Sequence, residues 1–99
     1  MNLIYFPANY KKPLLAEKKT MTIRVKDEIG KYKKNQTYKA KSYAKRDWNA
    51  RVKVLDVIKT PLSQLSHLGV PKKSIESIRN REKLNDSSKV ELINFNLIK

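Results

Sequence analysis

The sequence contains no cysteine, a single histidine and only 9 acidic residues among 99. The absence of cysteine excludes disulfide bridges, thiolate metal sites and cysteine nucleophiles. With His67 as the sole imidazole, a zinc site would have to rely mainly on carboxylates. We therefore expect a protein that uses no metal and no other cofactor.

Long apolar runs are also missing. The longest are a few residues, far short of the roughly 20 needed to cross a bilayer. The first residues lack the basic lead and apolar stretch of a signal peptide. We therefore expect no membrane partner and a cytoplasmic location. The scarcity of cysteine and glycine beside 32% charged residues would suit a hyperthermophile, although a low-GC genome gives a similar lysine bias.

Positive charge is what the chain has in excess, with a formal net charge of +14. Residues 1–53 carry 15 Lys and Arg against 4 Asp and Glu, whereas residues 54–99 carry 8 against 5. A field of this size attracts polyanions, and phosphate backbones are the commonest of these. The alternative is a solvated surface that lysines keep soluble, but the asymmetry favours an anionic partner.

The length and the hydrophobic pattern predict one domain with one modest core. Period-2 alternation and turn signals predict strands over residues 2–6, 20–26, 36–43, 50–58 and 89–98. Helical segments are expected over residues 8–17, 60–67 and 71–84, with Thr60 as the N-cap of the second. This order predicts an α+β fold, a small β-barrel of about five strands with two or three short helices on its ends.

Three of the predicted strands carry basic or hydroxyl side chains on their polar face. Residues 20–26 place Thr22, Arg24 and Lys26 on one face, and residues 50–58 place Arg51 and Lys53 outward. The inward face of residues 36–43 stays open, since Tyr38, Ala40 and Ser42 alternate with Lys39, Lys41 and Tyr43. If these strands are neighbours, the cations share one surface, with Tyr43 and Trp48 at its edge. The alternative is a solvated sheet face that is rich in lysine to discourage edge pairing.

Lysine and arginine neutralise phosphates, and an aromatic ring that stacks on an unpaired base contributes roughly 1–3 kcal/mol. Trp48, beside Arg46, is either such a stacking platform or a lid over the core. His67 is expected to be a packing residue at a helix end, with general-base chemistry as the alternative. Arg79 and Arg81 on the last predicted helix would extend the basic surface, diluted by neighbouring glutamates.

Residues 14–24, LLAEKKTMTIR, closely resemble the signature of ASCH domains, in which a helix ending in Leu-x-Gly-x-Lys-Thr runs into a strand Thr-Ile-Arg. The resemblance continues in residues 30–32 (GKY), 36–38 (QTY) and the closing strand 90–98 (VELINFNLI). It implies one ASCH domain over residues 1–99, a PUA-like barrel related to RNA-modification modules. It further implies a cleft between barrel and helices that accepts RNA or a modified nucleoside, with Lys19, Thr22 and Arg24 pointing into it.

The chain departs from the ASCH pattern at two positions. Glu17 stands where the family has glycine, at a helix end where glycine tolerates a left-handed backbone. The second departure is Thr22, which stands where many ASCH domains have an acidic residue. A threonine at this position resembles the branch of acetylcytidine amidohydrolases, in which a lysine, this threonine and a later glutamate perform the reaction. Lys19 and Thr22 match that branch, but residues 66–73 contain no acid where the glutamate is expected. Glu76 is the nearest acidic residue.

We therefore expect an RNA-binding module without catalysis, since ASCH-like barrels resemble RNA modules. One alternative is a small hydrolase of acetylated cytidine or of RNA that uses Lys19 and Thr22. A second is a DNA-binding accessory protein. The oligomeric state is left open. The candidate nucleic-acid-binding residues are Lys19, Thr22, Arg24, Lys26, Lys39, Lys41, Tyr43, Arg46, Trp48, Arg51 and Lys53.

Overall fold

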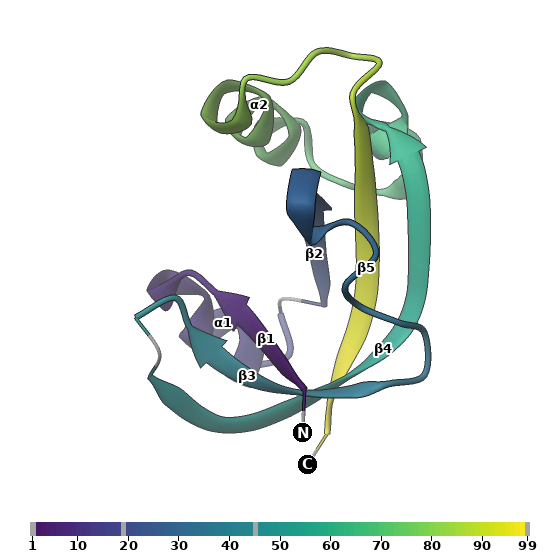
Figure 1. Cartoon of the computed structure of the whole chain (residues 1–99). Helices are drawn as coiled ribbons and strands as arrows, with labels where there is room; N and C mark the ends of the chain where they lie inside the picture. The colour runs from purple at the N-terminus through teal and green to yellow at the C-terminus, as the bar shows by residue number, and fades with distance from the viewer. Residues whose placement is uncertain (1, 19, 45, 99) are drawn as a thin grey trace.

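The computed structural model describes residues 2–18, 20–44 and 46–98 (Figure 1). Its strands are β1 (Leu3–Phe6), β2 (Met21–Val25), β3 (Thr37–Ser42), β4 (Asp47–Pro61) and β5 (Lys89–Ile98). Its α-helices are α1 (Lys11–Leu15) and α2 (Lys72–Glu82), and its 3-10 helices are η1 (Ala8–Tyr10), η2 (Lys26–Glu28) and η3 (Leu62–Leu68).

The strands form one mixed sheet in the order β1-β3-β4-β5-β2, in which β1 runs parallel to β3 and all other pairs are antiparallel. Irregular register between Ala40 and Lys41 and between Val54 and Asp56 bends it. In Figure 1, β1 and β3 lie at the lower left, beside the part of β4 that curves away from the upright β4–β5 pair. Within the described residues no ladder joins β1 to β2, so the sheet is open and the predicted barrel is not confirmed.

The two faces of the sheet bury two hydrophobic clusters. One contains Ile4, Phe6, Tyr38, Val52 and Phe95. The other lies under η3 and α2 and includes Leu62, Leu65, Ile75, Val90 and Leu92. Because alternate residues of a strand face opposite sides, β5 contributes to both clusters. This double burial explains why residues 90–95 lack a clean alternation of polar and apolar side chains.

Element boundaries differ from the prediction where long-range pairing overrides a local signal. The predicted helix start at Thr60 is wrong, since Thr60 pairs with Val90 and β4 continues to Pro61. The segment that follows is a 3-10 helix that ends, as expected, at Gly69 with φ of 89°. The predicted helix over residues 8–17 is divided between η1 and α1. Leu14 is buried there, whereas Leu15 is 42% exposed.

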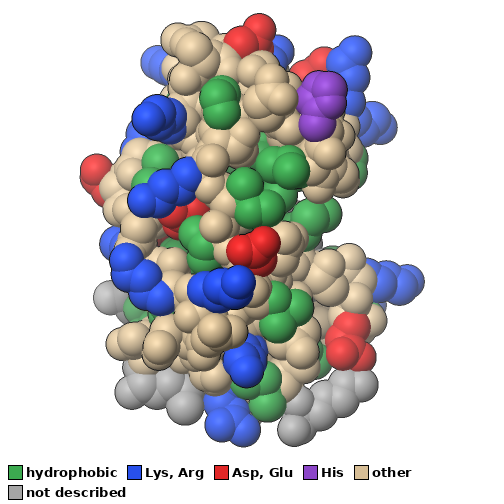
Figure 2. Space-filling model, turned by 90° about the vertical axis from the view of Figure 1, so that its right-hand side faces the viewer, with side chains coloured by type: hydrophobic (Ala, Val, Ile, Leu, Met, Phe, Trp, Pro, Cys, Tyr) green, Lys and Arg blue, Asp and Glu red, His purple; other side chains and the backbone are tan. Residues whose placement is uncertain are grey.

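On the face of the molecule shown in Figure 2, Lys and Arg side chains lie apart from one another rather than in one continuous patch. On the side of the molecule formed by β4 they alternate with hydrophobic and a few acidic side chains (Figure 2). The exposed imidazole of His67 on η3 lies on this surface. A net charge of +14 therefore acts as a general attraction for polyanions, and any specific site must come from local geometry.

Glu17 adopts a left-handed backbone with φ of 58°, as the comparison with the ASCH glycine predicts. A non-glycine residue is strained there, so replacing Glu17 with glycine should raise the free energy of unfolding by about 0.5–1 kcal/mol, after the greater entropy of the unfolded chain is subtracted. The melting temperature should rise by about 3–6 °C. Glu17→Ala removes the same carboxylate but keeps the strain, so an equal melting temperature for the two variants would contradict this explanation.

Candidate nucleic-acid-binding cleft

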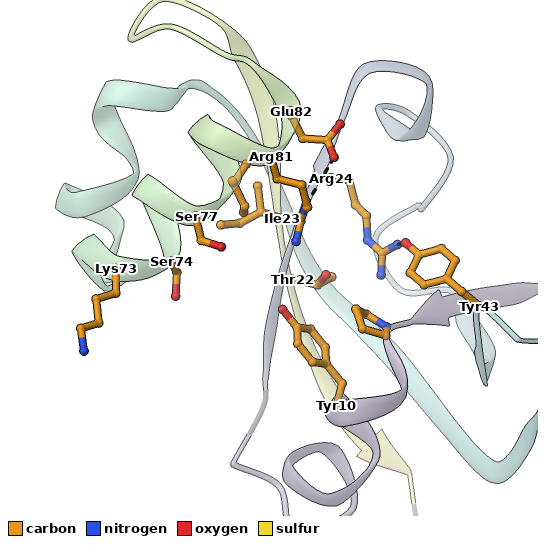
Figure 3. Close-up of a pocket in the computed structure, with 12 residues that line it drawn as sticks. Tyr10, Thr22, Ile23, Arg24, Tyr43, Lys73, Ser74, Ser77, Arg81 and Glu82 are labelled. Atoms are coloured by element: carbon orange, nitrogen blue, oxygen red, sulfur yellow. Dashed lines mark hydrogen bonds and ion pairs between the residues drawn. The ribbon is translucent and has the colours of Figure 1, made fainter.

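A cleft of about 500 Å³ lies where the β1 and β2 edges of the sheet approach α2. Figure 3 shows its walls: β2 on one side, α2 on another, and the segments that follow β1 and β3 on the third. Its lining residues are Pro7, Tyr10, Thr22, Ile23, Arg24, Tyr43, Lys73, Ser74, Ser77, Ile78, Arg81 and Glu82. Aromatic, hydroxyl and charged side chains therefore converge on one space.

Strand β2 contributes Thr22 and Arg24, which are 5% and 4% exposed and belong to the lining. The cleft position implied by the ASCH resemblance therefore agrees with the structure for both residues. The prediction that they share a surface with the cations of β3 and β4 is wrong. Strand β5 separates β2 from β4, and the face of β2 that carries Thr22 turns toward Ile93 of the first core.

Two of the three nitrogens of the Arg24 guanidinium have hydrogen-bond partners inside the protein, whereas its buried Nε has none. Nη2 donates to the carbonyl of Tyr5 at 2.9 Å, and Nη1 donates to Glu28 Oε1 at 3.3 Å and to Tyr43 Oη at 3.4 Å. Its carbon Cζ lies 5.2 Å from the ring centroid of Phe6 and 5.1 Å from that of Tyr32. Arg24 thus connects β2 to β1 across the gap in the sheet, which is a structural role rather than a free phosphate contact.

Two buried groups complete the surroundings of Arg24. Burial raises the pKa of Tyr32 to about 12, although the Arg24 charge acts to lower it, so the phenol stays neutral. Glu91 is fully buried, faces Arg24 in the β2–β5 register and accepts a hydrogen bond from the Gly30 N–H at 3.3 Å. Sequence reasoning missed this cluster; the signal was a single glutamate within the apolar run 90–93 of β5.

Helix α2 supplies cations that the sequence-based candidate set does not include. Lys73, Ser77 and Arg81 recur every four residues, which places them on one helix face, and Ser74 lies beside them. That face is adjacent to the buried stripe of Ile75 and Ile78. The recurrence was visible in the sequence, but nothing there indicated that this face of the helix would meet β2.

The acidic residue of the cleft is Glu82, at the end of α2. Its carboxylate lies 3.6 Å from Lys26 Nζ and 3.4 Å from Arg81 Nε. Lys26, a predicted phosphate contact, is thus paired with an acid at the rim. Glu76 is exposed and is not among the cleft residues. The hydrolase alternative now has Thr22 and Glu82 in one cleft, but Lys19 lies outside the described residues, so that alternative stays a prediction.

Four of the predicted cations do share one surface. Tyr38, Ala40 and Ser42 are buried and therefore form the inward face of β3, which the sequence had left undecided. Lys39 and Lys41 lie on its outward face. In the β3–β4 register Lys39 stands opposite Arg51, and Lys53 lies two residues further along β4. We call Lys39, Lys41, Arg51 and Lys53 the outer basic face.

One acidic side chain, Asp47, offsets part of this charge. Asp47 stands opposite Lys41 and forms an ion pair with Lys39. The hydrogen bond from Lys39, together with that from the Asn49 N–H, lowers the pKa of the Asp47 carboxyl below its usual value. Asp47 therefore stays ionised and neutralises one of the four cations of the outer basic face.

Trp48 is a core residue, 7% exposed, and its ring stacks on Phe6 with centroids 6.1 Å apart and an interplanar angle of 14°. Of the two alternatives for Trp48, the structure supports the lid over the core. Arg46 is exposed next to it, and its backbone N–H donates to Ser42 Oγ at 3.1 Å. The exposed aromatic ring of the candidate set is instead Tyr43.

Two kinds of site are absent from the part of the chain that the structure describes. No group of three or more His, Asp or Glu side chains there is arranged to hold a metal ion. No helix among the same residues is both long and apolar enough to span a membrane.

No protein-family model matches this sequence, and no curated protein matches it either. The fold is similar to the crystal structure of an ASCH domain from Lactobacillus crispatus JV V101, with a TM-score of 0.71 and 11% identity over 97% of this chain and 78% of that one. It is also similar to two single-site mutants of ZmASCH from Zymomonas mobilis, one with a tyrosine changed to phenylalanine and one with a serine changed to alanine. Their TM-scores are 0.70 and 0.66 at 11% identity, over 95% and 94% of this chain and 67% and 65% of those. The chain therefore has the ASCH-domain fold.

Proposed function

We propose that this chain is an RNA-binding module that holds a single unpaired or modified nucleotide in the cleft between β2 and α2. The observation that carries the proposal is the composition of the cleft. Lys73 and Arg81 approach from α2, hydroxyl groups line the walls, and the ring of Tyr43 stands at the rim, 59% exposed. These are the groups that bind phosphate, pair with base edges and stack on a base.

The chemical roles follow from the partners that each side chain already has. Arg24 is held by Tyr5, Glu28 and Tyr43, and Arg81 is paired with Glu82, which also contacts Lys26. Lys73 takes part in none of the ion pairs formed by the described residues. The hydroxyls of Thr22, Ser74 and Ser77 can each donate and accept, which suits base edges and the ribose 2′-OH. The ASCH-domain fold supports RNA over DNA as the ligand.

Replacing Lys73 and Arg81 together by alanine should weaken binding of single-stranded RNA by about tenfold for each cation removed. The dissociation constant is measured by fluorescence anisotropy with a labelled oligonucleotide. Lys72→Ala with Arg79→Ala is the matched control, because it removes the same charge from the same helix outside the cleft lining. Equal weakening in both variants would mean that net charge, and not the cleft, binds RNA.

The DNA alternative is tested with the same protein. Single-stranded DNA of the same sequence and duplex DNA compete against the labelled RNA. We expect RNA to bind most tightly, because the hydroxyls of the cleft can contact the 2′-OH. A preference for duplex DNA would overturn the RNA proposal and support the accessory-protein alternative.

A further inference from the structure

The aromatic pair Tyr43 and Tyr5 connects the cleft to the outside of the sheet. Tyr43 lines the cleft, and its hydroxyl accepts the hydrogen bond from Arg24. The ring of Tyr43 stacks on that of Tyr5, with centroids 6.1 Å apart and an interplanar angle of 20°. Since Tyr43 is mostly exposed, one stacked pair is accessible from the cleft mouth.

Tyr5 belongs to the outer side of β1. Ile4 and Phe6 are fully buried in the first core, so alternation turns Tyr5 the other way. In the parallel β1–β3 register Tyr5 stands opposite Lys41. The Tyr43–Tyr5 pair therefore leads from the cleft, over the edge of the sheet at β1, directly to the outer basic face.

The outer basic face places like charges next to each other, an arrangement that destabilises the free sheet and favours the binding of an anion. Lys39 and Arg51 stand directly opposite each other, and like charges at such positions destabilise a sheet. A shallow hollow of about 350 Å³ lies between them, lined by Lys39, Asn49, Ala50 and Arg51. Asp47 compensates Lys39, which leaves Lys41, Arg51 and Lys53 as the uncompensated cations.

We propose that the RNA strand whose nucleotide occupies the cleft continues over Tyr43 and Tyr5 and lies along the outer basic face. This inference rests on the proposed function and specifies its ligand as an unpaired RNA segment of several nucleotides. A free nucleoside would occupy the cleft alone. A duplex is excluded, because the strand must place one base in the cleft and then turn over the edge of the sheet.

The first test uses two triple variants of the full chain and oligonucleotides of increasing length, up to about 10 nucleotides. The first variant replaces Lys41, Arg51 and Lys53 with glutamine. For long RNA, the slope of log affinity against log salt should fall in magnitude by about 2, since each phosphate contact of a single strand contributes about 0.7. A mononucleotide should bind as tightly as it does to the wild type. Replacing Lys59, Lys72 and Lys89 with glutamine is the charge-matched control and should leave the slope unchanged, because these lysines are exposed and belong neither to the cleft lining nor to the outer basic face.

The aromatic junction is tested separately. Tyr43→Ala should weaken the binding of long RNA about tenfold through loss of base stacking. Tyr43→Phe keeps the ring, loses only the hydroxyl that contacts Arg24, and should retain most of the affinity. Equal losses in both variants would assign the effect to the Arg24 contact and overturn the stacking role.

Failure of the inference and failure of the proposed function give different results. Suppose that the Lys41, Arg51 and Lys53 variant keeps the wild-type slope and length dependence while the Lys73 and Arg81 variant binds RNA weakly. The path over the sheet edge is then wrong, and the proposal that the cleft binds RNA is retained. If neither variant changes RNA binding, the proposed function itself is wrong. Binding of an RNA duplex as tightly as of a single strand would also overturn the inference.

Discussion

Replacing Arg24 by alanine is expected to lower the free energy of unfolding by about 3–5 kcal/mol, the loss typical of removing one partner from a buried ionic cluster. Arg24 is 4% exposed and is the group that joins the β1 and β2 edges through Tyr5, Glu28 and Tyr43. Its removal leaves the fully buried Glu91 without the cation that faces it in the register. Because small domains are stable by only about 5–15 kcal/mol, the loss is a large fraction of the total.

The free energy of unfolding is measured by urea titration, with the fluorescence of the single, buried tryptophan, Trp48, as the signal. Arg24→Lys keeps the charge but loses the planar fork that reaches three partners, so its loss should be smaller than that of Arg24→Ala. This second variant keeps the test informative if Arg24→Ala does not fold. A loss below about 1 kcal/mol in the alanine variant would show that the contacts of Arg24 are incidental.

Affinity for single-stranded RNA should fall about 100-fold when monovalent salt is raised from about 50 mM to about 200 mM. The cleft offers Lys73 and also Arg81, which must exchange Glu82 for a phosphate, and the outer basic face offers the uncompensated cations Lys41, Arg51 and Lys53. About five phosphate contacts at about 0.7 each give a slope near −3.5, and a fourfold rise in salt then produces the stated loss.

The measurement is a series of binding isotherms for one oligonucleotide across that salt range. Circular dichroism of the free protein at each salt concentration is the control, because the fold must not change for the slope to report on contacts. Single-stranded DNA of the same sequence should give a similar slope with weaker binding, since both backbones carry the same charge. An affinity that is flat in salt would contradict both the cleft and the outer basic face as phosphate-binding surfaces.

The elements that local pattern predicted correctly are those whose periodicity is their own property. Residues 89–98 form β5, residues 71–84 contain α2 with Ile75 and Ile78 buried, and residues 20–26 contain β2. The errors lie where distant residues compete with a local signal. Pairing of Thr60 with Val90 extends β4 through the expected helix cap, because a ladder hydrogen bond replaces the cap.

The same distinction applies to the site. Alternation showed that Thr22 and Arg24 share one side of a strand, but not which side the fold covers. The tertiary structure decides that, since β2 is the edge strand opposite β1 and its pairing with β5 turns both side chains toward the first core. Arg81 was expected only to extend the basic surface, and Lys73 was not singled out. Both line the cleft because α2 lies against β2, a contact between segments about 50 residues apart that no local pattern encodes.

The amino-acid sequence alone therefore establishes the charge of +14, the absence of cysteine chemistry, the motif that resembles ASCH domains and the presence of Glu17 where that motif has glycine. These are properties of composition, of short segments and of single residues. The three-dimensional arrangement establishes which cations face a cleft, which form the outer basic face and which, like Arg24, are buried with partners. Those outcomes depend on strand order and on packing between distant segments, because periodicity sets the alternation of side chains but not the direction of burial.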